Sequence, residues 1–206
     1  SGRTFVNNGS GNFSEKFQLV FKVDADYEDM GSIFIDPDND GDLDLFVVSG
    51  GVECSAGDNI LQDRLYLNDG NGQFGKAASG LIPRINASGS VAIAADINKN
   101  GKLELFIGGR VVPGSYPENP RSYLLSNSGA RYLDVTKDII PEVEYSGMVT
   151  SALFSDVDGS LITDKMWGIY YKPDFNFKGV QGGSAPYKII KPVDDVKVDP
   201  YGPDSP

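Results

Sequence analysis

An Asp-rich segment that recurs every 60 residues constrains this chain more than any other feature. It occupies residues 36–46 and 96–106, and a third copy covers residues 156–164. A second motif, rich in Asn and Gly, recurs out of phase with it at residues 6–13, 67–74 and, in degenerate form, 125–132. Repeats of this length predict one supersecondary unit that is copied along the chain and stacked on its neighbours.

The segments between these motifs have the composition of β-strands. Short runs rich in β-branched and aromatic residues lie at 33–35, 45–48, 64–67, 91–94 and 105–107. The Asn-Gly motifs supply the positive backbone angles that hairpin turns need. No stretch has sustained helical periodicity. With about four strands per period, we predict an all-β chain of incomplete β-propeller-type blades, each a four-stranded antiparallel sheet, followed by an irregular C-terminal tail.

The first Asp-rich loop has the pattern of a calcium site. Asp36, Asp38, Asp40 and Asp44 stand at positions one, three, five and nine, and position six is a glycine that permits a sharp turn. The backbone carbonyl of Asp42, at position seven, can also face inward. Four carboxylates that converge repel one another strongly unless a cation lies between them, and a flexible all-oxygen cage suits Ca²⁺ better than Mg²⁺. The alternative is a solvated acidic turn.

The other two loops are weaker versions of the first. The second offers Asp96, Asn98, Asn100 and Glu104, with Lys102 at position seven. It keeps the glycine at position six but has two carboxylates, so we expect either a weaker calcium site or a turn held by Asn side-chain hydrogen bonds. The third offers Asp156, Asp158, Ser160 and Asp164. Its position six is a leucine, and it is either a site or a degenerate copy.

The composition excludes several functions. The chain has no histidine and one cysteine, which removes His-dependent catalysis, disulfides within the chain and thiolate metal clusters. A net charge of −11 opposes nucleic-acid binding, and no apolar run is long enough to insert into a membrane. The chain opens without Met or an apolar leader, so we expect a targeting segment to be absent or already removed. Weak calcium sites fill readily outside the cell, which favours an extracellular location.

Several stretches resemble a known family. Residues 42–51, 61–70, 108–114 and 121–125 are similar to the FG-GAP or VCBS repeats of integrin α-type β-propellers and of bacterial VCBS-repeat surface proteins. The resemblance covers about residues 3–164. It implies an exported, calcium-stabilised propeller, located at the cell surface, that serves binding or adhesion without catalysis.

The repeat pattern divides the chain into two parts. Residues 1–164 contain about two full blades and partial ones, and residues 165–206 are expected to form an extended Pro- and Gly-rich tail. Residues 166–206 weakly resemble a segment of amino-acid-oxidase-like flavoproteins, which leaves a fragment of an enzyme as one alternative. Because closed propellers need about four to eight blades, a second alternative is a self-assembling subunit of a filament or sheath. The expected partners are a protein or glycan at the cell surface, or copies of the chain itself.

Overall fold

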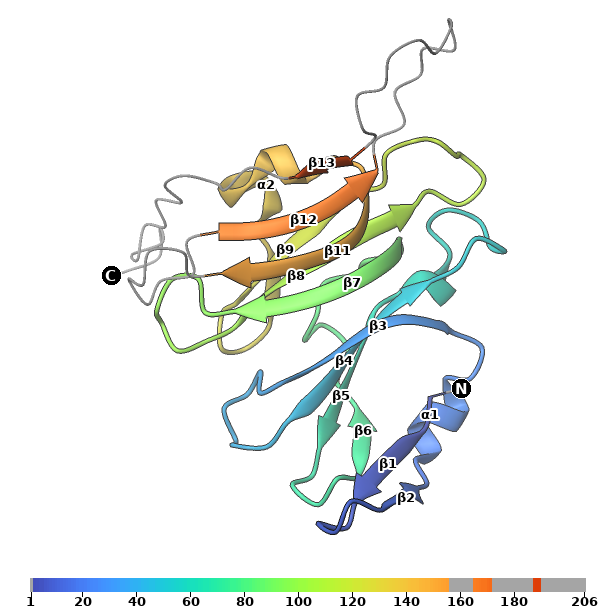
Figure 1. Ribbon diagram of the computed structural model, residues 1–206, viewed down its shortest axis with the longest axis vertical. Coiled ribbons are helices and arrows are strands. Elements are labelled where there is room, and N and C mark those ends of the chain that lie inside the picture. Colours follow the sequence, from blue (N-terminus) through green and yellow to red (C-terminus); the bar gives the residue numbers. More distant parts are fainter. Residues whose placement is uncertain (1, 156–164, 172–186, 190–206) are drawn as a thin grey trace, which may run out of the picture.

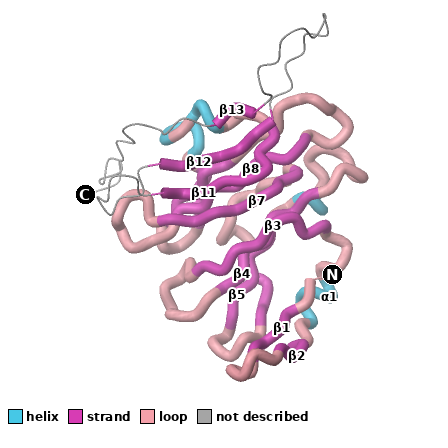
Figure 2. The backbone as a smooth tube through the Cα atoms, viewed as in Figure 1, coloured by secondary structure: helices cyan, strands magenta, loops and turns pink. Residues whose placement is uncertain are grey.

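The computed structural model describes residues 2–155, 165–171 and 187–189, and these form antiparallel sheets with very short helices between them (Figures 1 and 2). An N-terminal hairpin pairs β1 (Thr4–Asn7) with β2 (Phe13–Lys16). The first sheet contains β3 (Glu28–Ile35), β4 (Asp44–Gly50), β5 (Arg64–Asn68) and β6 (Phe74–Lys76). The second sheet contains β7 (Ser88–Ala95), β8 (Glu104–Val111), β9 (Tyr123–Asn127) and β10 (Tyr132–Asp134). The third sheet contains β11 (Met148–Ser155), β12 (Lys165–Tyr171) and β13 (Tyr187–Ile189).

The first two sheets have the same plan, which confirms the predicted four-stranded antiparallel unit. In each, the four strands pair in chain order as a meander. The Asp-rich loops join the first strand to the second, and the Asn-Gly motifs join the third strand to the fourth. Gly70 and Gly72 adopt φ values of +74° and +73° in one of these outer turns, as the motif predicts. The repeats seen in the sequence are therefore structural repeats.

The sheets stack with their first strands side by side. Strand β3 contacts β7, and β7 contacts β11, as Figure 1 shows. Glycine makes the first of these approaches possible, because a Cβ at position 31 would lie 2.9 Å from the carbonyl oxygen of Ser90 and 3.2 Å from the Cα of Val91. Position 31 therefore requires glycine, because the backbones of β3 and β7 lie too close together for a side chain.

Among the described residues, two apolar clusters join the stacked sheets and a third joins a helix to the first sheet. The first lies between the first and second sheets, the second between the second and third sheets, and the third between the first sheet and helix α1 (Leu19–Val23). Phe46 and Phe106 occupy equivalent positions of β4 and β8, and both are completely buried. Burial of one such side chain contributes about 1.5–3 kcal/mol. Strands β4 and β8 consist largely of buried residues because layers cover both of their faces.

Elements beyond the predicted strands are short. Helix α2 (Thr136–Ile139) and the 3₁₀ turns η1 (Asn59–Leu61) and η2 (Pro141–Val143) fill connections between strands. Each spans a single turn, which is too short to produce the helical periodicity that a sequence pattern detects.

The structure describes residues 165–171 and 187–189 of the predicted C-terminal tail, and both segments are strands. Within this segment β12 pairs with β11 and β13 pairs with β12, all antiparallel, so both strands continue the third sheet. The Gly- and Pro-rich parts of the tail lie outside the described residues. The proposed boundary at residue 164 and the flavoprotein likeness stay predictions.

Candidate metal centre

The first Asp-rich loop brings three predicted ligands together. It connects β3 to β4, and its turn is made by Asn39 and Gly41 with φ values of +58° and +92°. The carboxylates of Asp36, Asp38 and Asp40 each present an oxygen that lies within 4.8 Å of the other two. This arrangement matches the predicted convergence of positions one, three and five.

Hydrogen bonds inside the loop leave part of this acidic group unpaired. Asp36 Oδ2 accepts a hydrogen bond from the Gly41 amide at 3.1 Å, and Asp40 Oδ1 accepts one from the Asp42 amide at 3.0 Å. The other oxygen of Asp36, Oδ1, is buried and has no hydrogen-bond partner among the described residues. A buried carboxylate oxygen without a partner is costly, and a cation removes that cost.

Asp44, at position nine, is buried and is not one of the three carboxylates that converge. Its side chain is 1% exposed, and Oδ1 accepts a 2.6 Å hydrogen bond from the Asn68 amide of β5. Oδ2 is buried with no partner in the described part of the chain. Burial, together with the charges of Asp38, Asp40 and Asp42, raises the pKa of Asp44 to about 6 against the lowering effect of the Asn68 hydrogen bond. Asp44 is thus close enough to the other carboxylates to sense their charge.

The side chain of Asp42 adds a further carboxylate to the acidic residues of the first loop. Its Oδ1 is buried and unpaired among the described residues, and its other oxygen lies against Gly70 in the β5–β6 turn. Burial raises its pKa, followed by the charges of Asp40, Asp38 and Asp36. The sequence assigned this residue only a backbone carbonyl. With three unpaired buried oxygens, the first loop fits a hard divalent cation such as Ca²⁺.

The second loop has the same backbone. It connects β7 to β8, and Lys99 and Gly101 adopt φ values of +59° and +79°, as Asn39 and Gly41 do in the first loop. Because two loops of different charge share one conformation, the turn itself does not require four carboxylates.

The oxygens of the second loop have partners within the protein. Asp96 accepts hydrogen bonds from the amides of Asn100 at 3.1 Å and Gly101 at 2.8 Å. Glu104, 1% exposed, accepts from Asn98 Nδ2 at 3.1 Å and from the Ile97 amide at 3.1 Å, and burial raises its pKa. These contacts are those expected of a turn held by side-chain hydrogen bonds.

Lys102 further distinguishes the second loop from the first. It stands where the first loop has Asp42, and its ammonium group lies against Gly129 of the β9–β10 turn. A cationic side chain at this position lowers the need for a metal ion. Calcium at the second loop stays a prediction, and the third loop, with Asp156, Asp158, Ser160 and Asp164, lies outside the described residues.

Two asparagines beside the loops hold the first loop in place, although the sequence pattern predicted only that they form turns. Asn68 donates its side-chain amide to the Leu43 carbonyl of the first loop at 3.2 Å. Asn127, its counterpart in the second sheet, donates to the Pro37 carbonyl of the same loop at 2.9 Å. Both asparagines occupy the same position of the Asn-Gly motif, and this was the feature of the sequence that could have identified them. The motif does not predict which loop each side chain contacts.

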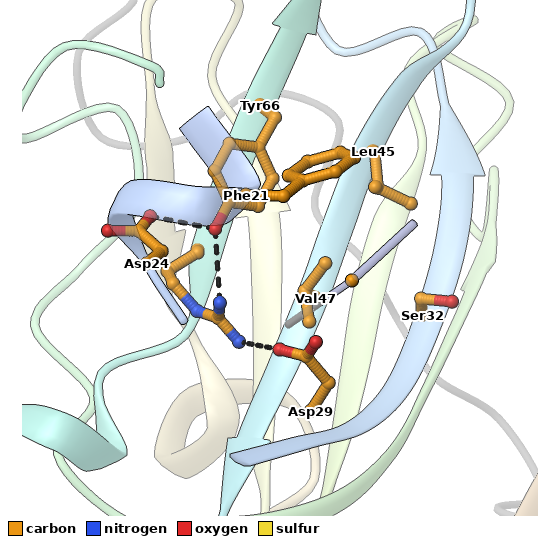
Figure 3. A pocket seen from close by; sticks show the side chains of 9 residues that line it. Phe21, Asp24, Asp29, Ser32, Leu45, Val47 and Tyr66 are labelled. Atoms are coloured by element: carbon orange, nitrogen blue, oxygen red, sulfur yellow. Dashed lines mark hydrogen bonds and ion pairs between the residues drawn. The ribbon is translucent and has the colours of Figure 1, made fainter. Parts of the chain in front are cut away.

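A buried polar network anchors helix α1 to the first sheet (Figure 3). The Tyr66 hydroxyl donates to Asp24 Oδ2 at 2.8 Å and accepts from the Arg64 guanidinium at 3.0 Å. Arg64, itself buried, also pairs with Asp29. The ring of Phe21 stands edge-on to Tyr66, with ring centroids 5.0 Å apart. These groups line a small cavity of about 120 Å³, and their mutual pairing gives them a structural role.

Two stacked four-stranded antiparallel meanders, each with an Asp-rich loop between its first and second strands, define a blade-repeat protein of the β-propeller type. The model of the FG-GAP-like repeat family matches residues 36–107, from the first Asp-rich loop into β8. Residues 36–107 are therefore similar to an FG-GAP-like repeat. A search of curated proteins finds no match. Within the described residues, no helix has the length and apolar character needed to cross a membrane.

Proposed function

We propose that this chain is a calcium-stabilised, non-catalytic binding or structural module that works outside the cell. The observation that carries the proposal is the first loop, where the carboxylates of Asp36, Asp38 and Asp40 converge. Buried oxygens of Asp36, Asp42 and Asp44 there have no partner among the residues that the structure describes. A cation would neutralise their repulsion and satisfy those oxygens. Because the folded loop gathers the ligands and the unfolded chain does not, bound calcium would stabilise the native state.

The family context supports the location and the absence of catalysis. FG-GAP repeats occur in extracellular or surface proteins, and the family is typically non-enzymatic. Calcium is abundant outside cells, where modules with dissociation constants of about 10⁻⁴–10⁻³ M are occupied. The alternative of an enzyme fragment depends on the C-terminal tail, most of which lies outside the described residues.

Thermal unfolding of the whole chain tests the proposal. The midpoint is measured with calcium in excess and again with a chelator, for the wild type and for the Asp38→Asn variant. We expect calcium to raise the wild-type midpoint, and we expect Asp38→Asn to lose most of that rise. Asp26→Asn is the matched control, because Asp26 is an exposed aspartate outside the loop and its loss changes the net charge equally. A wild-type midpoint that is indifferent to calcium would overturn the proposal.

One observation favours a partner at the N-terminal end of the stack. Large apolar side chains there are more than half exposed: Phe5, Phe13, Phe17, Leu19 and Val23. Exposed apolar surface of this kind favours association with a protein partner or with further copies of the chain, as in a filament or sheath. Light scattering over a range of concentrations tests self-association, and a Phe13→Ser, Phe17→Ser double variant is expected to reduce it. A glycan stays the other candidate ligand.

A further inference from the structure

The N-terminal hairpin has the register of the outer half of a four-stranded sheet. In β1–β2, as in β5–β6 and β9–β10, the asparagine of the Asn-Gly motif lies opposite an aromatic residue. The three pairs are Asn7 with Phe13, Asn68 with Phe74 and Asn127 with Tyr132. Each hairpin then leads through a segment of similar length, residues 17–27, 77–87 or 135–147, to the first strand of a sheet. Strands β1 and β2 are therefore equivalent to the third and fourth strands of the first two sheets.

One edge of this hairpin is free. Strand β5 pairs with β4 and β9 pairs with β8, whereas β1 pairs with β2 alone among the described residues. The Asn8 amide donates to the Asn12 carbonyl at 2.9 Å. Because hydrogen-bonded pairs alternate along an antiparallel ladder, the amide and carbonyl of Phe5 face away from β2. The backbone of Phe5 thus presents a donor and an acceptor to a further strand.

The aromatic side chains of the hairpin lack the cover that their equivalents have. Phe5 is 52% exposed and Phe13 is 66% exposed. Tyr66 and Phe74, which occupy the same positions of β5 and β6, are 1% and 9% exposed. Exposed aromatic surface next to a free strand edge indicates that the hairpin lies at an interface.

The third sheet has the opposite half. Strand β11 stacks on β7 as its first strand, and β12 is its second. When the register is counted from the strand pair next to each Asp-rich loop, residues 166–168 of β12 are equivalent to 45–47 of β4 and 105–107 of β8, which pair with the third strands. Strand β13 pairs with residues 169–171 instead. Residues 166–168 therefore have no third-strand partner in the part of the chain that the structure describes.

An exposed apolar side chain lies beside this position. Leu133 of β10 is 41% exposed. It pairs with Ser126 and so lies on the same face of the second sheet as Leu124, which packs in the cluster between the second and third sheets. A third and a fourth strand added to the third sheet would extend that packing over Leu133.

We infer that the N-terminal hairpin of one copy completes the third sheet of a second copy, with β1 antiparallel to β12 and Phe5 opposite Met166. Figure 1 shows the hairpin and the third sheet at opposite ends of the stack, so β1 does not reach β12 of its own chain. In a closed pair, each chain supplies two complete sheets and each of the two junctions supplies one more. The resulting six sheets are within the roughly four to eight of closed propellers.

The inference rests on the proposed self-association, for which it names the partner surface, and it does not depend on calcium binding by the first loop. Size-exclusion chromatography with light scattering tests it on the whole chain. We expect the wild type to have the mass of two chains. Phe5→Pro is expected to weaken the dimer at least about tenfold, because proline removes the amide that faces β12.

Glu15→Pro is the matched control. Glu15 lies opposite Phe5, and its amide faces the other edge of the hairpin. The substitution also breaks the exposed ion pair between Glu15 and Arg3, which is expected to contribute little. The Glu15→Pro variant is therefore expected to keep the mass of two chains.

Disulfide cross-linking tests the register without a proline. In a Cys54→Ser background, Phe5→Cys with Met166→Cys places thiols on residues whose Cα atoms would lie about 4.5–5.5 Å apart, within the range of a disulfide. With oxidised glutathione as the oxidant, we expect a covalent dimer. Phe5→Cys with Gly168→Cys increases the separation to about 7–8 Å and is expected to cross-link at least about fivefold less.

A mass of one chain at all concentrations, or a mass that grows beyond two chains, would overturn the inference. Equal weakening by Phe5→Pro and Glu15→Pro would also overturn it, as would equal cross-linking by the two cysteine pairs. Circular dichroism on each variant separates a lost contact from a lost fold. A monomer whose unfolding midpoint still rises with calcium would overturn this inference and leave the calcium-stabilised module supported.

Discussion

The side-chain amide of Asn127 donates a 2.9 Å hydrogen bond to the carbonyl oxygen of Pro37, 90 residues earlier in the chain. Pro37 is the second residue of the first Asp-rich loop, and Asn127 ends β9 in the second sheet. The Oδ1 of the same asparagine accepts from the Gly129 amide at 2.8 Å, which fixes the side chain in its own turn. The first loop is therefore part of the contact between the two sheets.

Asn127→Ala is expected to lower the free energy of unfolding by about 1–2 kcal/mol, because it removes two hydrogen bonds, one of them between sheets. Urea denaturation in calcium-free buffer measures the change. Asn71→Ala is the control, since Asn71 lies in the equivalent outer turn of the first sheet but its side chain is exposed and bonds only locally. Equal losses in the two variants would show that the contact with Pro37 adds nothing.

Gly31→Ala is expected to destabilise the stack by about 1–3 kcal/mol, because the added Cβ would lie 2.9 Å from a backbone oxygen of β7 that cannot move freely. Gly75→Ala, in β6, is the matched control because a Cβ at that position meets nothing within 4 Å. Denaturant unfolding of both variants measures the difference. If the Gly31→Ala variant were as stable as the Gly75→Ala variant, this would contradict the close approach of β3 and β7.

The strands and turns could be predicted from the sequence because each is determined locally. Runs such as 45–48 and the turn at Gly70 and Gly72 follow from residue type and spacing alone. The first loop could be predicted for the same reason, since its carboxylates lie within nine residues. The residue types of the second loop, with two carboxylates in place of four, predict a weaker calcium site, and this stays a prediction.

Contacts between distant segments could not be predicted in this way. Asn127 reaches Pro37 only because the two sheets stack. A single sequence contains no signal for which copy of a repeat faces which. The strand β13 was missed because its surroundings are rich in Gly and Pro and the strand is three residues long.

Tyr66→Phe is expected to lower the free energy of unfolding by about 1–3 kcal/mol, because it leaves the buried Asp24 and Arg64 without the hydroxyl that joins them. Burial raises the pKa of Tyr66, so the hydroxyl keeps its proton at physiological pH. Limited proteolysis is expected to cleave the N-terminal segment faster in this variant. Tyr145→Phe alters an exposed tyrosine and is expected to change neither property.

The buried carboxyl of Asp63 predicts a dependence of stability on pH. Burial raises its pKa from 3.8 to about 8, against the opposing effects of the Ser49 amide and Arg64. Between about pH 4 and 8 the unfolded chain has released this proton while the folded chain retains it, so the contribution of Asp63 to stability falls as the pH rises through this window.

Asp63→Asn removes that titration. The stability of the variant relative to the wild type is therefore expected to increase from pH 5 to pH 8, by at most about 1.4 kcal/mol per pH unit. Denaturant unfolding at a series of pH values measures it. A difference between variant and wild type that stays constant across the series would mean that Asp63 is ionised throughout.

The two described Asp-rich loops are expected to differ in calcium binding. The reason is that the protein supplies hydrogen-bond partners to more of the side-chain oxygens in the second loop than in the first. Asp96 accepts two backbone hydrogen bonds and Glu104 accepts from Asn98 and Ile97. Asp44, in contrast, retains a buried oxygen that has no partner in the described part of the chain. Calorimetric titration with calcium should therefore show a saturable event that Asp38→Asn removes and Asp96→Asn preserves. Loss of a binding event in Asp96→Asn, with the fold intact by circular dichroism, would instead assign a calcium ion to the second loop.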